Sequence, residues 1–129
     1  MHVSRLMAIV LAAGTVACGS STPTNPSNTV GVTIHDFTFS PASLTIKAGT
    51  TVRWTNTGPS AHTTVSDAGA WTSPTLSAPV SGGGGYGGGG SSGGTFEFTF
   101  TQPGDYPYHC SIHPPANFPG FTGTVKVTS

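Results

Sequence analysis

Charged residues are scarce in this chain of 129 residues. Lysine and arginine together number four, aspartate and glutamate also number four, and the formal net charge at pH 7 is zero. Proteins that hold nucleic acids carry clusters of basic residues, because the phosphate backbone supplies much of the binding energy. The composition therefore gives no indication of a nucleic-acid partner.

Long hydrophobic runs are also lacking. The most apolar stretch, residues 6–13, follows Arg5 near the amino terminus and is too short to cross a bilayer. A basic residue, a short apolar run and then small residues are typical of a secretory signal peptide. We therefore assign residues 1–17 to a signal and expect the protein to be exported to the cell envelope, facing the periplasm or the cell exterior.

Cysteine occurs only twice, at Cys18 and Cys110. Cys18 follows a small residue at the end of the signal and precedes Gly19 and Ser20, which resembles a bacterial lipoprotein cleavage site, although Thr15 stands where leucine is usual. This resemblance implies that Cys18 is lipidated and that residues 18–29 form a flexible tether at a membrane, since the spacer is rich in Ser, Thr and Pro. The alternative is an ordinary signal cut nearby that leaves a free thiol.

A disulfide is the usual expectation for two cysteines in an exported chain. Here a bridge would draw the tether onto the folded domain and consume Cys110, which lies in a metal-ligand motif. We therefore expect no disulfide.

Residues 30–129 show strand patterns and almost no helical period. Apolar residues alternate with polar ones around positions 30–34, 44–46, 52–54, 96–100 and 125–127, and Gly and Pro residues separate these runs. Short strands at this spacing predict one all-β domain, a Greek-key β-sandwich. We also predict that residues 95–101 form an antiparallel hairpin with residues 106–110, which would put Thr95 level with Cys110.

A glycine-rich run at residues 81–94 interrupts the strand patterns. Its composition buries too little apolar area to offset the entropy of ordering, so we expect a mobile loop insertion. The alternative is that Tyr86, at its tip, contacts a redox partner or the membrane.

A candidate metal site lies where the last aromatic run ends. Cys110 and His113 are three residues apart, and His62 lies upstream. The two-residue period of a strand puts Tyr106, Tyr108 and Cys110 on one face. A thiolate with two imidazoles suits copper in electron transfer, because the soft sulfur favours Cu(I) while the imidazoles also hold Cu(II).

Several segments together resemble the cupredoxins, the small blue copper proteins such as plastocyanin, amicyanin and halocyanin. They are FTFSP at 37–41, KAGTTVRWTN at 47–56, HTTV at 62–65, GTFEF at 94–98, PGDY at 103–106, YHCSIHP at 108–114 and GTV at 123–125. The resemblance covers residues 30–129. It implies one type 1 copper ion held by His62, Cys110 and His113.

The resemblance also bears on neighbouring residues. Asn56 matches a family asparagine that braces the ligand loops, the alternative being a simple turn asparagine. His109 faces away from the metal by strand alternation and lies where the family has a surface aromatic on an electron route. His35 is expected at the surface or rim, and His2 is lost with the signal.

The fourth, axial position departs from the family, which usually has a methionine there. The only methionines are Met1 and Met7, both in the predicted signal. Aligning on the GTV segment puts Phe121 at this position, which implies a three-coordinate copper of high potential. Asn117 is the alternative, because its amide oxygen would act as an axial ligand and lower the potential.

The predicted function is electron transfer in the cell envelope between transient redox partners, without enzymatic activity. The partners would meet an apolar surface that includes Pro59, Pro114, Pro115, Phe118 and Phe121. A copper-handling or tolerance role is the main alternative, because it would use the same ligands, although methionine-rich and extra histidine tracts are absent.

Three further functions fit less well. An oxidase would need His-x-His pairs for an oxygen site, and the sequence has none. A closed zinc site would need a fourth ligand. The remaining alternative is a scaffold sandwich in which these residues have no metal role.

Overall fold

The computed structural model describes residues 28–82 and 89–129. The predicted signal, Cys18, nearly all of the predicted tether and Tyr86 lie outside these ranges, so the predictions for them stay predictions. Across the described residues, no helix has the length and apolar character needed to cross a membrane.

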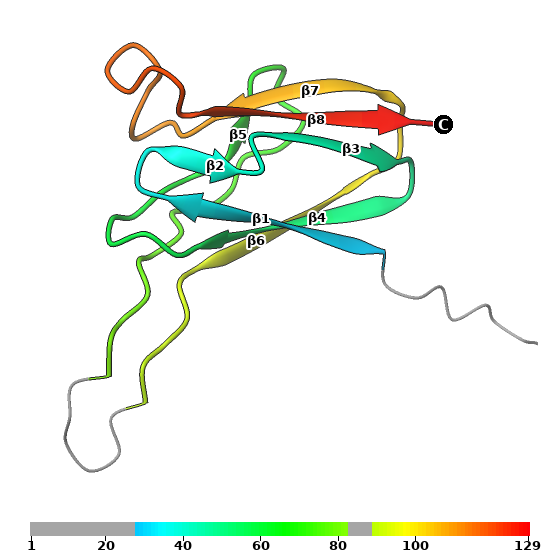
Figure 1. The fold of residues 1–129 in the computed structure, drawn as a ribbon. Helices are drawn as coiled ribbons and strands as arrows, with labels where there is room; N and C mark the ends of the chain where they lie inside the picture. Colours follow the sequence, from blue (N-terminus) through cyan, green and yellow to red (C-terminus); the bar gives the residue numbers. More distant parts are fainter. Residues whose placement is uncertain (1–27, 83–88) are drawn as a thin grey trace, which may run out of the picture.

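Eight strands form two four-stranded sheets that pack face to face (Figure 1). The first sheet has the order β2 (Thr38–Ser40), β1 (Thr29–His35), β4 (Thr50–Asn56), β6 (Thr95–Phe100). The second has the order β3 (Ser43–Lys47), β8 (Thr122–Thr128), β7 (Gly104–His109), β5 (Val65–Ser66). Both sheets are mixed, because β1 runs parallel to β4 and β3 runs parallel to β8. The predicted all-β sandwich is confirmed.

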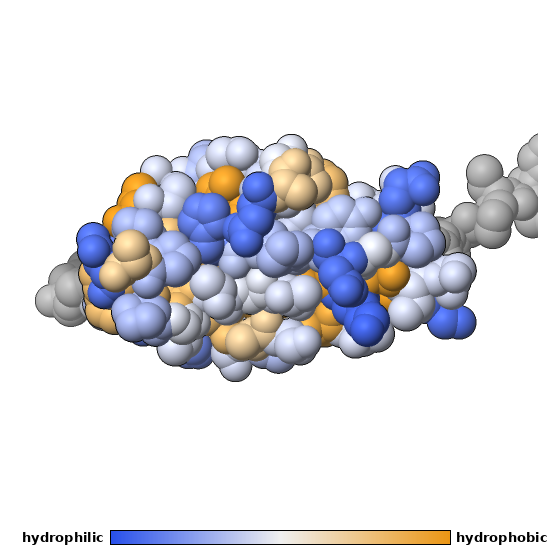
Figure 2. All heavy atoms as spheres, turned by 90° about the horizontal axis from the view of Figure 1, so that it is seen from above, coloured by the Kyte–Doolittle hydropathy of each residue, from blue (hydrophilic) through white to orange (hydrophobic). Residues whose placement is uncertain are grey.

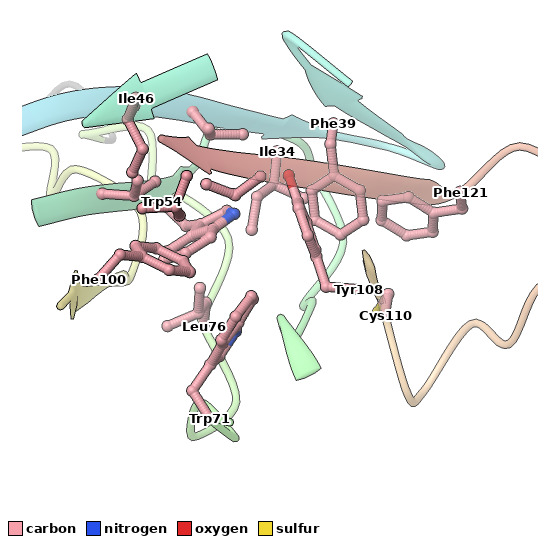
Figure 3. Packing of buried hydrophobic residues seen from close by; sticks show 14 residues of the cluster. Ile34, Phe39, Ile46, Trp54, Trp71, Leu76, Phe100, Tyr108, Cys110 and Phe121 are labelled. Atoms are coloured by element: carbon pink, nitrogen blue, oxygen red, sulfur yellow. The ribbon is translucent and has the colours of Figure 1, made fainter. Parts of the chain in front are cut away.

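The alternation read from the sequence gives each sheet one buried face. In β4, Val52 and Trp54 are fully buried, whereas Arg53 points outward and pairs with Glu97 on β6. Aromatic rings fill much of the space between the sheets (Figure 3). Burial raises the pKa of Tyr108 to about 12, so its hydroxyl stays protonated inside the core at neutral pH.

The predicted hairpin between residues 95–101 and 106–110 is wrong. β6 pairs with β4, where Thr95 lies opposite Thr55, and β7 pairs with β8 and β5 in the other sheet. The connection between β6 and β7 therefore crosses from one sheet to the other. Alternating apolar residues on either side of a Pro-Gly turn look the same in a hairpin and in such a crossing. Here the rings of Phe100 and Tyr106 meet across the core, with centroids 5.0 Å apart.

The last residues of the glycine-rich run are packed rather than free. The backbone nitrogen of Asn56 donates to the carbonyl of Gly94, and Gly93 is buried. A Cβ on Gly93 would lie 1.8 Å from the carbonyl oxygen of Asn56, so only glycine allows this approach. The mobility expected of the whole run does not extend to these two residues.

The outer surface of the second sheet is mostly polar. Seen from above, hydrophilic and neutral residues cover most of this face, and apolar residues form small, separate areas (Figure 2). The apolar residues of both sheets are buried in the core. We therefore expect functional contacts at the end of the sandwich where Cys110 lies.

Candidate metal centre

His62, Cys110 and His113 meet at one end of the sandwich. The Nδ1 atoms of the two histidines are 3.2 Å apart, and Cys110 Sγ lies 3.9 Å from His62 Nδ1 and 3.7 Å from His113 Nδ1. Among the described residues, these three form a cluster of metal-type donors whose ligand atoms all lie within 4.8 Å of one another.

Strand endings and one short backbone bridge position the three side chains. Cys110 follows the last residue of β7 and points into the core, as Tyr108 does two residues earlier. The chain then turns, which brings His113 back over the sulfur. His62 lies between β4 and β5, where its backbone N–H and C=O both bond to Leu76, at 3.0 and 2.7 Å.

The spacing and chemistry of these donors fit one bound metal ion. Bonds of about 2.0–2.3 Å from a small ion to nitrogen and sulfur place the donor atoms roughly 3–4 Å from one another. The observed separations lie in that range, and the donor set is one thiolate with two imidazoles. Such a set suits copper that changes between its two oxidation states.

Thr63 supplies hydrogen-bond donors to the sulfur. Its backbone N–H lies 3.4 Å from Cys110 Sγ, and its hydroxyl oxygen lies 3.6 Å from the same atom. The hydroxyl also accepts from the backbone N–H of Ser111 at 2.9 Å, which ties the two ligand loops together. Donors aimed at a thiolate stabilise its negative charge. Sequence analysis did not identify Thr63, which has no distinguishing signal beyond being the neighbour of His62.

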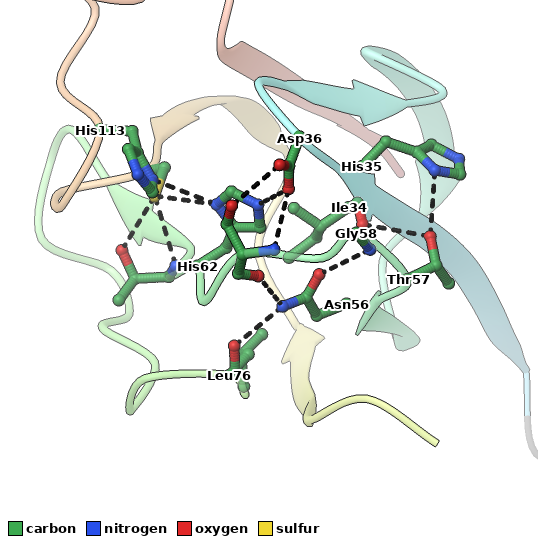
Figure 4. Close-up of polar contacts among 12 residues, drawn as sticks. Ile34, His35, Asp36, Asn56, Thr57, Gly58, His62, Leu76 and His113 are labelled. Carbon is green, nitrogen blue, oxygen red and sulfur yellow. Dashed lines mark hydrogen bonds and ion pairs between the residues drawn. The ribbon is translucent and has the colours of Figure 1, made fainter. Parts of the chain in front are cut away.

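Asn56 sits at the end of β4, fully buried, with three hydrogen bonds (Figure 4). Its Nδ2 donates to the carbonyls of Ser60 and Leu76, at 2.7 and 2.9 Å, and its Oδ1 accepts from Gly58 N–H at 3.0 Å. These bonds hold the loop that carries His62. The bracing role of Asn56 stays a prediction, and these bonds are the contacts that such a role requires.

Asp36 contacts the Nε2 atom of His62, on the ring edge opposite to the one that carries Nδ1 and faces the cluster. Its Oδ1 lies 3.0 Å from His62 Nε2, and this hydrogen bond is the main cause that lowers the pKa of Asp36. Because an ionised carboxylate only accepts, Nε2 carries the hydrogen and Nδ1 turns its lone pair toward Cys110 and His113. Sequence analysis missed Asp36, whose 26-residue separation from His62 hides the contact.

The two axial candidates differ in their surroundings. Phe121 is fully buried in the core (Figure 3). Its ring lies beside His62, with centroids 5.1 Å apart. Asn117 is exposed and lies in a turn in which its backbone N–H donates to the carbonyl of Pro114. Phe121 therefore lies against a ligand histidine, whereas Asn117 faces the solvent.

Two further aromatic rings flank His113. Phe37 and Phe118 stack with centroids 4.4 Å apart, and each meets the His113 ring edge to face, at 5.3 and 5.0 Å. Phe37 is 40% exposed. Of the three clustered side chains, His113 alone is half-buried, and the other two are fully buried. Phe37 was not predicted as part of the apolar partner surface, whereas the prediction that included Phe121 there is wrong, because Phe121 is fully buried.

The remaining described histidines stand apart from the cluster. The ring of His109 faces away from the sulfur and its Nδ1 lies 2.6 Å from Asp67 Oδ1. His35 is exposed at the end of β1, where its ring contacts the hydroxyls of Thr33 and Thr57. Both positions agree with the exclusion of these residues from the ligand set.

Comparison with known proteins decides the family. A sequence model described as copper binding proteins, plastocyanin/azurin family, matches residues 26–128. The chain belongs to this family. Its members are cupredoxins, and the cofactor of this cupredoxin is one copper ion.

Solved structures share the fold. A purple cupredoxin from Nitrosopumilus maritimus is 28% identical, with a TM-score of 0.58 over 77% of this chain and 99% of that one. An oxidised amicyanin variant is 25% identical, with a TM-score of 0.57 over 77% of this chain and 81% of that one. A copper-containing nitrite reductase from Thermus scotoductus SA-01 is 27% identical over 78% of this chain, but the match covers only 22% of the reductase.

Proposed function

We propose that this cupredoxin carries single electrons, using a type 1 copper ion held by His62, Cys110 and His113. Bound copper supplies a one-electron couple between Cu(I) and Cu(II). The chain's own residues hold the donor atoms at the end of a packed sandwich, where Thr63 bonds to the sulfur and Asn56 bonds to the loop that carries His62. A site that changes little between oxidation states is what rapid electron transfer requires.

The observation that carries this proposal is the unequal exposure of the three ligands. His62 and Cys110 are fully buried, whereas His113 is half-buried. An electron can therefore enter or leave through the edge of one imidazole while the sulfur stays shielded from water and oxidants. A protein that hands over the metal itself would need wider access to the donor atoms.

The surroundings of His113 suit a transient protein partner. Phe37 and Phe118 give the rim around this ring an apolar character. Redox complexes of this kind bury little surface and dissociate readily. We propose that a redox protein docks over this rim.

We propose Phe121, not Asn117, as the residue at the axial position. Phe121 is buried against His62, and an exposed asparagine would have to leave its turn to reach the cluster. A phenyl ring offers no donor atom to stabilise Cu(II). The expected consequence is a high reduction potential.

The amino-terminal sequence supports a location in the cell envelope. We propose that a signal of residues 1–17 is removed, that Cys18 is lipidated, and that residues 18–29 tether the domain 30–129 to a membrane. Detergent extraction and mass spectrometry of the purified protein would reveal an acylated Cys18. A Cys18→Ser variant should then be recovered without acyl chains in the soluble fraction.

The copper site is tested by visible and electron paramagnetic resonance spectra of the protein loaded with Cu(II). We expect an intense sulfur-to-copper charge-transfer band and narrow copper hyperfine splitting. Cys110→Ser should abolish both, whereas Cys18→Ser, the matched control at the other cysteine, should leave both unchanged.

The same experiment separates electron transfer from copper handling. A protein that binds Cu(I) tightly but gives no charge-transfer band with Cu(II) would move the assignment to copper delivery or tolerance. Enzymatic turnover is not part of the proposal, because the resemblance to the nitrite reductase covers only about a fifth of that enzyme.

A further inference from the structure

We propose that Asp36 is a positioning residue for the copper site, acting through His62. The inference rests on the proposed copper function. It assigns a role to a carboxylate that the sequence motifs did not single out.

The turn between β1 and β2 serves both ligand histidines. Only two residues, Asp36 and Phe37, separate the paired residues His35 and Thr38. Phe37 has a φ of 64°, a left-handed conformation that residues with a side chain rarely adopt. In this conformation the Phe37 ring lies against His113, while the preceding carboxylate reaches His62.

The carboxylate of Asp36 is fixed by more than its contact with His62. Ser60 donates to it twice, from its backbone N–H to Oδ1 at 3.1 Å and from its hydroxyl to Oδ2 at 2.8 Å (Figure 4). Ser60 is in turn held by Asn56, whose amide donates to the Ser60 carbonyl. The carboxylate therefore has little freedom to turn away from Nε2.

Gly58 leaves the space that the carboxylate occupies. A Cβ at this position would lie 2.6 Å from Asp36 Oδ1 and 2.8 Å from the Asp36 backbone nitrogen. The backbone N–H groups of Thr57 and Gly58 also both donate to the carbonyl of Ile34. The ends of β1 and β4 are thus joined closely enough to bring Asp36 onto His62.

A carboxylate behind a ligand histidine has two effects on a bound metal. It fixes the tautomer, so that Nδ1 offers a lone pair to the cluster, and it makes the imidazole a stronger donor. Its negative charge also favours the more highly charged Cu(II) over Cu(I). Asp36 should therefore lower the reduction potential of the site. Its effect opposes that of the missing axial donor, which raises the potential.

The test compares Asp36→Asn and Asp36→Ala with Asp67→Asn. Asp67 is the matched control, because it is also a carboxylate paired with a histidine, but its partner His109 lies outside the cluster. Asp36→Asn keeps a hydrogen-bond acceptor and removes the charge. Asp36→Ala removes both. The measured quantities are the reduction potential and the Cu(I) and Cu(II) affinities of the full chain.

We expect Asp36→Asn to lower the ratio of Cu(II) to Cu(I) affinity about tenfold, which raises the potential by about 59 mV for one electron. Asp36→Ala should raise the potential by at least as much and should also weaken copper binding. Asp67→Asn should leave the potential unchanged. An Asp36→Asn protein with the wild-type potential would overturn the proposal, even if it unfolded more easily.

A measurement without copper tests the same contact and does not depend on any variant folding. Nitrogen-15 NMR of the wild-type, metal-free protein should show His62 protonated at Nε2 and unprotonated at Nδ1. The opposite tautomer would overturn the role of Asp36. Wild-type protein that binds no Cu(II) would instead defeat the proposed function, so the two failures are distinct.

Discussion

The ring of Phe121 meets the ring of His62 edge to face, with centroids 5.1 Å apart and planes at 89°. The sequence has no methionine between residues 30 and 129, and we proposed Phe121 for the axial position. Because both residues are fully buried, water does not reach this side of His62. On this proposal, Phe121 shields His62 from water and offers a bound metal no axial donor atom.

Replacing Phe121 with methionine should supply that donor. Phe121→Met keeps an apolar side chain of similar size, and its thioether would stabilise Cu(II). We expect the reduction potential to fall by about 60 mV, a tenfold change in relative affinity. Phe121→Leu, which adds no donor, is the control in the same redox titration. An equal fall in both variants would mean that packing, not ligation, sets the potential.

Removing the hydroxyl of Thr63 should also lower the potential. Thr63→Val keeps the shape of the side chain but loses the O–H group near Cys110 Sγ. This hydroxyl favours the reduced state, because a hydrogen bond to the thiolate withdraws negative charge from the sulfur. One hydrogen bond of about 1 kcal/mol corresponds to about 40 mV. Thr63→Ser, which retains the hydroxyl, should keep the wild-type value. A wild-type potential in Thr63→Val would show that this hydroxyl does not act on the sulfur.

Asn56 should contribute to stability even without copper. Asn56→Ala removes three hydrogen bonds and leaves the buried carbonyl of Leu76 without the Asn56 amide as a partner. We expect the free energy of unfolding to fall by about 2–4 kcal/mol, measured with urea on metal-free protein. Asn28→Ala is the control, since exposed Asn28 makes a single side-chain bond to Thr50. Similar losses in the two variants would contradict the bracing role of Asn56.

The end of the glycine-rich run can be tested with two alanine substitutions. Gly93→Ala would force its Cβ against the carbonyl of Asn56, whereas a Cβ on Gly89 would meet nothing within 4 Å. We expect Gly93→Ala to lower the free energy of unfolding by about 1–3 kcal/mol, as overpacking does. Gly89→Ala should have almost no effect. If both variants are as stable as the wild type, residue 93 is not packed as described.

The apolar rim around His113 should control the rate of electron exchange. Phe118→Glu puts a charge beside His113 without changing the ligand set, so we expect electron self-exchange to slow at least about tenfold by NMR line broadening. The new charge should also lower the potential slightly, but self-exchange has no net driving force, so its rate still reports on the docking surface. Val80→Glu, at an exposed apolar residue that leads into the glycine-rich run, is the control. An unchanged rate in Phe118→Glu would place the docking surface elsewhere.

Local patterns explain why much of this protein was predictable. A strand places alternate residues on one face whatever the rest of the chain does, so the buried positions of Trp54, Tyr108 and Cys110 followed from spacing. Cys110 and His113 lie three residues apart, and a short turn suffices to bring them together. The family motifs then supplied His62.

Contacts between distant segments were not predictable in this way. The turn before β7 gave no sign that β6 and β7 belong to different sheets, because strand pairing depends on partners elsewhere in the chain. Asp36 likewise had no sequence signal that pointed to the site. It becomes a partner of His62 only because β1 and β4 run in parallel and end side by side.

The sequence by itself determined the all-β class, the copper-type donor set and the absence of an axial methionine, because these depend on residue identity and short-range spacing. Only the tertiary structure decided that Phe121 is buried against His62 while Asn117 faces solvent, and that a carboxylate supports the ligand histidine. Both outcomes depend on how two sheets stack and where their loops meet, which is set by packing across the whole core.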